Sequence, residues 1–289
     1  MNIAITGSTG FIGSALLKLL ENEKSYSISL FDRKRHSFEN IDSLNEFVYG
    51  MDVVIHLAGE TENEEFFYST NTLATKQLLD AIRLFGKKNA HFILASSFAV
   101  YEVQKTKIKL SEKKTNTIPR NHYGMSKLFA EELTAFYNRN YHIQTSILRI
   151  ANIYGPRKTN KHEMLIDRIV HAIDNDKPLK INGDGTQSRD FIYVDDVADA
   201  ICKAVQDKNP SLVVNICTGK EISVLSVVNK IEKLLGKKVI LQFNENNIEK
   251  GYWIGNPKKA KEKLGFLATT DIDKGLEQTI KGYLKNKNL

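Results

Sequence analysis

The first half of the chain alternates short apolar runs with amphipathic segments, and no other feature of the sequence limits its fold so strongly. Continuous apolar runs are typical of parallel strands buried on both faces, and the segments between them have helical periodicity. The predicted strands are residues 3–6, 28–31, 53–57, 92–95 and 146–150, and the predicted helices are residues 11–20, 72–85 and 126–137. Because strand–helix–strand units cross over with a right hand, the pattern predicts an α/β fold with a doubly wound parallel sheet.

The composition excludes several classes of protein. The chain has 289 residues, of which 42% are hydrophobic and 26% charged, as in an ordinary globular protein, and no apolar run is long enough to cross a membrane. The formal charge is +7, but the basic residues are scattered, so we expect neither a nucleic acid nor a membrane as partner. The N-terminus has no signal-peptide pattern, and we expect Cys202 and Cys217 to be reduced thiols of a cytoplasmic protein.

A glycine-rich turn, Gly7-Ser8-Thr9-Gly10-Phe11-Ile12-Gly13, joins the first predicted strand to the first predicted helix. The first glycine permits a tight turn, the second lets the backbone approach a pyrophosphate, and the third lets the helix pack on the strand. The helix N-terminus adds unpaired N–H groups and a favourable dipole. The motif predicts a Rossmann-type dinucleotide site contacted by Gly7, Gly10, Phe11, Ile12 and Gly13.

The end of the second predicted strand bears on the choice of cofactor. Asp32 follows the glycines by about 20 residues, where a carboxylate binds a ribose 2′-hydroxyl and repels a 2′-phosphate, which favours NAD. Arg33 and Arg35 stand beside it, and a guanidinium there could clamp the 2′-phosphate of NADP. We predict NAD as the cofactor, bound by Asp32 and Arg33, with NADP as the alternative.

The second half of the chain departs from the regular alternation. Its predicted strands are residues 191–193 and 213–216, and its predicted helices are residues 165–173, 197–205, 223–235, 258–264 and 272–284. Ser223 is expected to cap one helix, and Gly236 to end it. We predict an NAD(P)-binding domain over residues 1–155 and a smaller mixed α/β substrate-binding lobe over residues 156–289. A segment from about 190 to 217 is expected to pack back on the larger domain.

A tyrosine and a lysine four residues apart on one helix form a proton-transfer unit, because the ammonium stabilises a phenolate and lowers the tyrosine pKa. The chain contains four such pairs: Tyr101/Lys105, Tyr123/Lys127, Tyr154/Lys158 and Tyr283/Lys287. The first lies in a polar stretch, Gly155-Pro156 interrupts the third, and the fourth is expected to fray at the C-terminus. We therefore predict Tyr123 as the acid/base and Lys127 as its partner.

A serine stands where the predicted strand before this helix ends, in Ser96-Ser97-Phe98-Ala99-Val100-Tyr101. The carboxyl end of a parallel strand lies on the ligand-binding rim of the sheet. The serine hydroxyl can hydrogen-bond the substrate oxygen that the tyrosine protonates. His56 resembles a metal ligand in isolation but is expected to be a packed residue, and no cluster has metal-ligand spacing.

With these motifs the chain resembles the extended short-chain dehydrogenase/reductases, in particular the NAD-dependent epimerase/dehydratase family that acts on nucleotide sugars. The resemblance covers nearly the whole length. Besides the glycine turn, the serine motif and the tyrosine–lysine pair, it rests on residues 52–59, Asn71, residues 148–156 and residues 183–197.

The resemblance implies roles for individual residues. Ser97 and Tyr123 flank the reacting sugar oxygen as catalytic residues, and Lys127 holds the nicotinamide ribose. Further cofactor contacts are implied for Leu57, Ala58, Gly59 and Asn71, and further substrate contacts for Asn152 and Arg189. Arg189 would pair with the substrate diphosphate; the alternative is a surface ion pair with Asp190.

The chain also departs from the family pattern. Phe98-Ala99 stands where the dehydratases carry an acidic pair, which argues against 4,6-dehydration. The segments 35–42 and 60–70 are shorter than is usual in the family. Asp42 is a candidate for the acid near the adenine. No arginine follows Arg189, so a lysine such as Lys250 would replace a second diphosphate arginine.

We predict an NAD-dependent nucleotide-sugar epimerase that inverts C4 of a UDP-sugar through a transient 4-keto intermediate. One alternative is an NAD(P)H-dependent nucleotide-4-keto-sugar reductase. It would use Ser97, Tyr123 and Lys127 for a single hydride transfer and then release the oxidised cofactor. Another is a non-catalytic NAD(P)-sensing regulator, since fold does not fix function. The intact Ser97, Tyr123 and Lys127 argue against the regulator. A homodimer is one alternative for the assembly.

Overall fold

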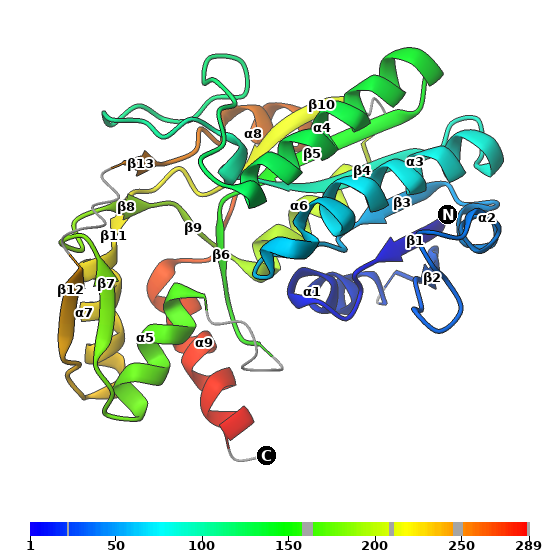
Figure 1. The fold of residues 1–289 in the computed structure, drawn as a ribbon. Helices are drawn as coiled ribbons and strands as arrows, with labels where there is room; N and C mark the ends of the chain where they lie inside the picture. Colours follow the sequence, from blue (N-terminus) through cyan, green and yellow to red (C-terminus); the bar gives the residue numbers. More distant parts are fainter. Residues whose placement is uncertain (22, 158–163, 208–210, 245–250, 288–289) are drawn as a thin grey trace.

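The computed structural model describes residues 1–21, 23–157, 164–207, 211–244 and 251–287. Its centre is a six-stranded parallel sheet in the order β10-β5-β4-β3-β1-β2 (Figure 1). The strands are β1 (Asn2–Thr6), β2 (Ser27–Leu30), β3 (Val53–His56), β4 (His91–Ser97), β5 (Gln144–Ile150) and β10 (Leu212–Ile216). The predicted doubly wound α/β class is confirmed. Strand order reverses between β1 and β3, the place where such sheets bind ligands at their carboxyl ends.

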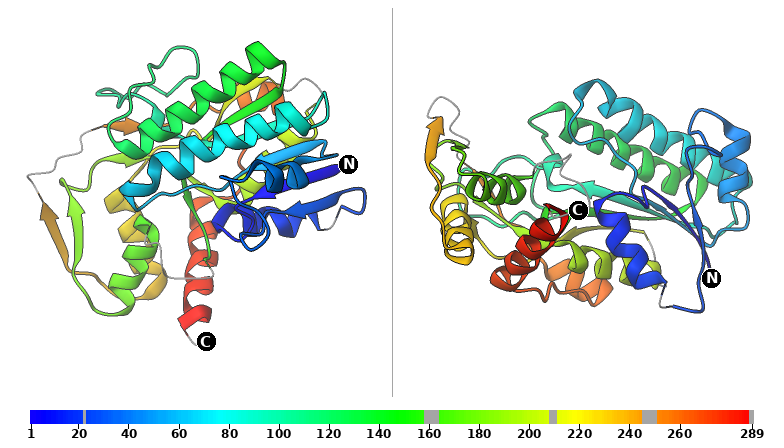
Figure 2. Two further views of the ribbon diagram at one scale, coloured as in Figure 1. Left: turned by 45° about the vertical axis from the view of Figure 1, so that its right-hand side comes forward. Right: turned by 90° about the horizontal axis from the view of Figure 1, so that it is seen from below.

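Helices cover both faces of this sheet (Figure 2). One face packs against α1 (Phe11–Leu20), α6 (Val194–Val205) and α8 (Lys258–Leu264), and the other against α2 (Ile41–Val48), α3 (Ala74–Phe85) and α4 (His122–Tyr141). Side chains alternate along each strand: Ile3 and Ile5 of β1 join the core on the α1 side, and Ala4 joins the core on the α2 side.

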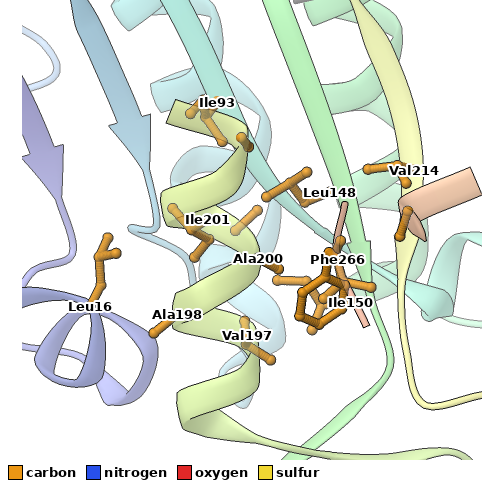
Figure 3. Packing of buried hydrophobic residues seen from close by; sticks show 14 of the residues in the cluster. Leu16, Ile93, Leu148, Ile150, Val197, Ala198, Ala200, Ile201, Val214 and Phe266 are labelled. Carbon is orange, nitrogen blue, oxygen red and sulfur yellow. The ribbon is translucent and has the colours of Figure 1, made fainter. Parts of the chain in front are cut away.

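The α6 helix packs closely because its core face carries small residues. Ala198, Ala200 and Ala204 are fully buried, and Figure 3 shows Ala198 facing Leu16 of α1. Val197 and Ile201 of the same helix lie in one cluster with Ile93, Leu148, Ile150 and Phe266. The chain then returns to the sheet as β10, which pairs with β5 in parallel.

The remaining elements form a smaller lobe. Parallel β7 (Leu179–Asn182) and β12 (Leu241–Asn244) lie beside α5 (Leu165–Asp174), α7 (Val224–Leu235) and α9 (Ile272–Lys287) around a second core. A three-stranded sheet contains β8 (Ser188–Arg189), β11 (Ile222–Ser223) and β13 (Tyr252–Trp253), and β6 (Asn152–Tyr154) pairs with β9 (Phe191–Tyr193). Ser223 caps α7 and Gly236 ends it in the left-handed conformation, as predicted.

The long connection from β4 to α4 begins with the 3₁₀ turn η3 (Phe98–Val100) and then joins the lobe. Tyr252 donates its N–H to the Gln104 carbonyl oxygen at 2.9 Å. Leu110 donates to the Ile254 carbonyl oxygen at 2.7 Å, and Asn256 donates to the Leu110 carbonyl oxygen at 2.9 Å. The connection between two segments of the candidate site is therefore fixed to the smaller lobe.

The structure adds elements that the periodicity did not predict. Asn40 caps α2 by accepting the N–H groups of Asp42 and Ser43. The 3₁₀ helix η1 (Glu64–Phe66) and the π-helix η2 (Phe67–Leu73) precede α3. The expected fraying of the Tyr283/Lys287 pair is wrong, because α9 continues to Lys287 and the Tyr283 hydroxyl lies 3.1 Å from His171 Nδ1.

Candidate active site

The glycines of the turn between β1 and α1 let it pack closely against the loop after β3 and against the start of α1. Gly7 has φ +71°, and a β-carbon there would lie 2.6 Å from the Ala58 nitrogen. A β-carbon on Gly13 would lie 2.3 Å from the Gly7 carbonyl oxygen. Gly10 occupies the N-cap position of α1, where no side chain caps the helix within the described residues. The turn therefore presents a glycine cradle and a helix N-terminus, which together fit the pyrophosphate of a dinucleotide.

Phe11 and Ile12 begin α1 directly beside this cradle. The Arg157 guanidinium lies 4.5 Å from the centroid of the Phe11 ring, and its Nε lies 3.2 Å from Asp167 Oδ2. Arg157 comes from the distant segment after β6, so sequence reasoning missed it; its one signal is its place directly after Gly155-Pro156. The structure thus brings a cation to the first turn of α1.

Asp32 and Arg33 are exposed after β2, at the same edge of the sheet as the glycine turn. Asp32 accepts the Lys34 N–H at 2.9 Å and donates its own N–H to His36 Nδ1 at 3.0 Å. Arg35 forms an ion pair with Glu46 at 2.6 Å. Arg35, one of the two arginines that could clamp a 2′-phosphate, is thus already paired with a carboxylate. Asp42 lies further on, in the first turn of α2.

A buried hydrogen-bonded chain fixes the loop after β3. The Ala58 N–H donates to Thr6 Oγ1 at 3.2 Å, and this hydroxyl lies 2.7 Å from His56 Nδ1. Burial lowers the pKa of His56 to about 3, so the ring is neutral at physiological pH. His56 is packed, as predicted, and it positions Leu57, Ala58 and Gly59 next to the glycine turn.

Asn71 lies behind this loop, in η2. Its Oδ1 accepts the Glu60 N–H at 2.8 Å, and its Nδ2 donates to the Glu60 carbonyl oxygen at 2.9 Å and to Ser126 Oγ at 3.0 Å. The side chain is 1% exposed. Asn71 therefore joins the β3 loop to α4, and its predicted contact with the cofactor stays a prediction.

Three side chains predicted to be catalytic meet at the carboxyl ends of β3 and β4. Ser97 ends β4, and its side chain is hydrogen-bonded to the Tyr123 hydroxyl from the first turn of α4. Lys127 follows one turn later and donates to the Ala95 carbonyl oxygen at 2.9 Å. A β-carbon on Gly59 would lie 3.3 Å from Lys127 Nζ, so this ammonium borders the loop predicted to hold the cofactor.

Burial dominates the ionisation of the tyrosine and the lysine. Burial raises the pKa of Tyr123 above its usual value, and the Ser97 hydrogen bond lowers it in part. The expected net lowering of this pKa is therefore not seen in the protein without ligands. Burial lowers the pKa of Lys127 to about 8, and the Glu131 carboxylate opposes this change. At neutral pH the pair consists of a phenol and an ammonium, so Tyr123 needs further positive charge to become a base.

Ser96, Glu131 and Arg149 form a polar cluster beneath these three side chains, and sequence reasoning gave none of them a role. Two signals were available. Glu131 follows Lys127 by four residues and so lies on the same helical face, and Arg149 interrupts an apolar strand.

Asn152 and Arg189, the residues predicted to bind substrate, lie in the adjoining β6 and β8. Asn152 donates its N–H and its Nδ2 to the Asp190 carbonyl oxygen, and Arg189 donates to the carbonyl oxygens of Ser188 and Gly251. The alternative of a surface pair with Asp190 is wrong, because that carboxylate is fully buried and accepts four hydrogen bonds from Thr218, Gly219 and Gly255. Lys250 lies outside the described residues.

No group of three or more His, Cys, Asp and Glu side chains could hold a metal ion in the ranges that the structure describes. What these ranges bring together is a dinucleotide cradle, a phenol–hydroxyl pair, a buried ammonium and a neighbouring arginine. This set is suited to moving a proton on a hydroxyl group while a bound dinucleotide exchanges hydride.

Comparisons with known proteins agree with this geometry. The UDP-glucose epimerase YtcB of Bacillus subtilis, described as uncharacterized, is 32% identical over 99% of this chain and 98% of its own. A putative UDP-glucose 4-epimerase of Methanocaldococcus jannaschii is 32% identical over 99% of both chains. The structure of Bacillus cereus UDP-glucuronic acid 4-epimerase with UDP-glucuronic acid and NAD matches with a TM-score of 0.88, at 29% identity over 99% of both chains. The model of the NAD dependent epimerase/dehydratase family matches residues 3–217, and the chain belongs to this family.

Proposed function

We propose that this protein is an NAD-dependent nucleotide-sugar epimerase that inverts C4 of a UDP-hexose. The observation that carries the proposal is the hydrogen-bonded pair of Ser97 and Tyr123 beside the buried Lys127 ammonium. A protein that only binds a dinucleotide has no need of such a unit. The relatives named for UDP-glucose and UDP-glucuronic acid support a UDP-sugar as substrate.

Each side chain has one task in the reaction. When held at the glycine turn, NAD would accept and return hydride at C4 of the sugar, and its positive charge would favour the Tyr123 phenolate. Tyr123 takes the proton of the C4 hydroxyl, and Ser97 donates a hydrogen bond to the same oxygen. Lys127 holds the nicotinamide ribose. Once the 4-keto sugar has turned its other face to the nicotinamide, Tyr123 returns the proton to the same oxygen, so the sugar is epimerised without net oxidation.

An assay that needs no added reductant tests this function. Purified protein with UDP-glucose or UDP-glucuronate should give the C4 epimer, detected by proton NMR, and the copurified cofactor should have the mass of NAD. Net consumption of NADPH with a UDP-4-keto sugar, and no epimer from either substrate, would identify a reductase. Binding of NAD without turnover of any UDP-sugar would leave only a sensor.

Asp32→Ala is expected to weaken NAD binding and to narrow the preference for NAD over NADP, because Asp32 is proposed to bind the ribose hydroxyls. Titration of both cofactors into wild type and variant measures the effect. Glu46→Ala is the matched control, since it releases Arg35 from its ion pair but leaves Asp32 in place. A wild-type preference for NADP would contradict this role of Asp32 and assign the choice to Arg33 or Arg35.

We further propose a homodimer formed through the outer face of α3 and α4, which lie side by side (Figure 1). Leu73, Phe129 and Phe136 are exposed there and border two grooves of about 470 and 330 Å³, and Tyr141 is exposed at the end of α4. The same face carries Lys76, Arg83 and Arg139 together with Asp80 and Glu132, so a second copy related by a two-fold axis can match its charges.

Phe136→Glu is expected to convert this dimer to monomers, because it places a charge in the apolar part of the face. Analytical ultracentrifugation measures the mass. Phe243→Glu is the control, since Phe243 is similarly exposed but lies on β12 of the other lobe. A monomeric wild type, or a dimer that survives Phe136→Glu, would contradict the proposed interface.

The ligands of this function favour the cytoplasm, where NAD and nucleotide sugars are available. Among the described residues no helix has the length and apolar character needed to span a bilayer. Cys202 and Cys217 are free thiols, which fits a reducing compartment. We propose a cytoplasmic enzyme.

A further inference from the structure

One turn beyond Lys127, Glu131 projects from the same face of α4 and is 3% exposed. It accepts Arg149 Nε at 3.0 Å and Arg149 Nη2 at 2.6 Å, and the Ser96 hydroxyl donates to Glu131 Oε1 at 2.5 Å. Ser96 directly precedes Ser97 at the end of β4, and Arg149 lies in β5. A single carboxylate therefore connects α4 to two strands immediately below the candidate catalytic side chains.

Arg149, which forms the ion pair with Glu131, is also fixed by contacts with its neighbours. Its guanidinium lies 4.7 Å from the centroid of the Tyr101 ring, and the Tyr101 hydroxyl donates to Asn215 Oδ1 of β10 at 2.6 Å. Arg149 is 7% exposed. A buried ion pair is usually no more stable than apolar side chains of the same volume. Packing alone therefore gives no reason for two charges at this point of the core.

The surroundings of Lys127 supply that reason. The charged and titratable groups that face it are Tyr123 and Glu131 of α4, His56 of β3 and, beyond the carboxylate, Arg149 of β5. His56 is neutral and Tyr123 is a phenol, so Glu131 is the anion of this set within the described chain. The Ala95 carbonyl oxygen gives the ammonium one hydrogen bond but no charge.

We propose that Glu131 is a positioning residue: its carboxylate, held by Arg149 and Ser96 one turn beyond Lys127 on the same face of α4, favours the ammonium form of the lysine and fixes α4 against β4. Its consequence for catalysis rests on the proposed function, because the ammonium matters there through Tyr123 and the nicotinamide ribose. The charge state of Lys127 can nevertheless be measured without any substrate.

The decisive experiment follows the ionisation of Lys127 directly. Lysine labelled with ¹³C at Cε is titrated by NMR in the full-length protein, and Lys127→Arg identifies the signal of Lys127. In wild type the midpoint is expected near the pKa of about 8, separate from exposed lysines. In Glu131→Gln the carboxylate is lost while Arg149 stays charged, so the midpoint should fall by about one pH unit or more.

Two controls separate charge from packing. Ser96→Ala removes a hydrogen bond to Glu131 but no charge, so the Lys127 midpoint should stay at its wild-type value. The double variant Glu131→Gln/Arg149→Met replaces the ion pair by neutral groups, which usually preserves a fold. Its midpoint should lie between those of wild type and Glu131→Gln, because the uncompensated guanidinium is gone. If Glu131→Gln does not fold, the Lys127 midpoint of the double variant is compared with that of wild type instead.

Activity gives an independent readout. The alkaline limb of the pH profile of kcat/KM should move to lower pH in Glu131→Gln by the same amount as the lysine titration. An unchanged Lys127 midpoint in both Glu131→Gln and the double variant would overturn the proposal and leave the epimerase function standing. A shifted midpoint in a protein that turns over no UDP-sugar would refute the function and leave the role of Glu131 standing.

Discussion

Tyr123→Phe is expected to lower kcat for C4 epimerisation by about a hundredfold or more, because the variant keeps the ring but has no group to accept the hydroxyl proton. NAD binding should remain, since Lys127 and the glycine turn are untouched. Stopped-flow or NMR rates measure kcat, and titration with NAD measures cofactor binding.

Tyr283→Phe provides the matched control for this experiment. Tyr283 also stands four residues before a lysine on a helix, but it lies in α9 of the smaller lobe, against His171. Its replacement should leave kcat unchanged. Near-normal turnover in Tyr123→Phe would assign the acid/base role to another group, and equal losses in both variants would indicate a general loss of structure.

Arg189→Ala is expected to raise KM for a UDP-sugar, with an effect of about 2 kcal/mol or more on kcat/KM. The guanidinium already donates to two carbonyl oxygens, so its direction is fixed before substrate arrives. A diphosphate offers two anionic groups to such a fork. UDP alone should protect wild type against thermal unfolding and should protect the variant far less.

Lys107→Ala serves as the control for net charge. Lys107 pairs with Glu221, which accepts the Ser188 hydroxyl, and Ser188 and Arg189 point to opposite faces of β8. Removing Lys107 therefore removes one cation from the other side of the same small sheet, and UDP affinity should not change. Calorimetry showing equal UDP affinity in Arg189→Ala and wild type would refute the diphosphate role. No UDP affinity in either would refute the nucleotide-sugar substrate.

Local sequence signals predicted much of the fold. The runs that became β3 and β5 contain consecutive Ile, Val and Leu residues, and α1 and α8 have the predicted bounds. The helix α2 was missed because its apolar residues Leu44, Phe47 and Val48 occupy barely two turns. The π-helix before α3 was missed because hydrogen bonds from Asn71 and Thr72 to α4 support it, and these join residues more than 50 positions apart.

The candidate site also contains some residues that local motifs predict and others that only the tertiary structure brings together. Gly7, Tyr123 and Lys127 belong to local motifs with a known spacing, so the sequence could single them out, and their roles stay predictions. The contacts of Glu131 with Ser96 and Arg149 join three elements, so the spacing of Glu131 from Lys127 and the arginine in an apolar strand do not by themselves predict that these residues meet. The pKa of Tyr123 was expected to be lowered, but the depth at which its hydroxyl is buried is a tertiary property that the motif does not encode.

The position of β10 determines when the protein can fold during synthesis. This strand pairs with the length of β5, yet it is made more than 60 residues later, after much of the smaller lobe. A chain that stops near residue 155 would expose the apolar edge of β5, which invites pairing with other chains. The nucleotide-binding sheet can therefore be completed only after residue 216 has left the ribosome, and a fragment of residues 1–155 should aggregate rather than fold.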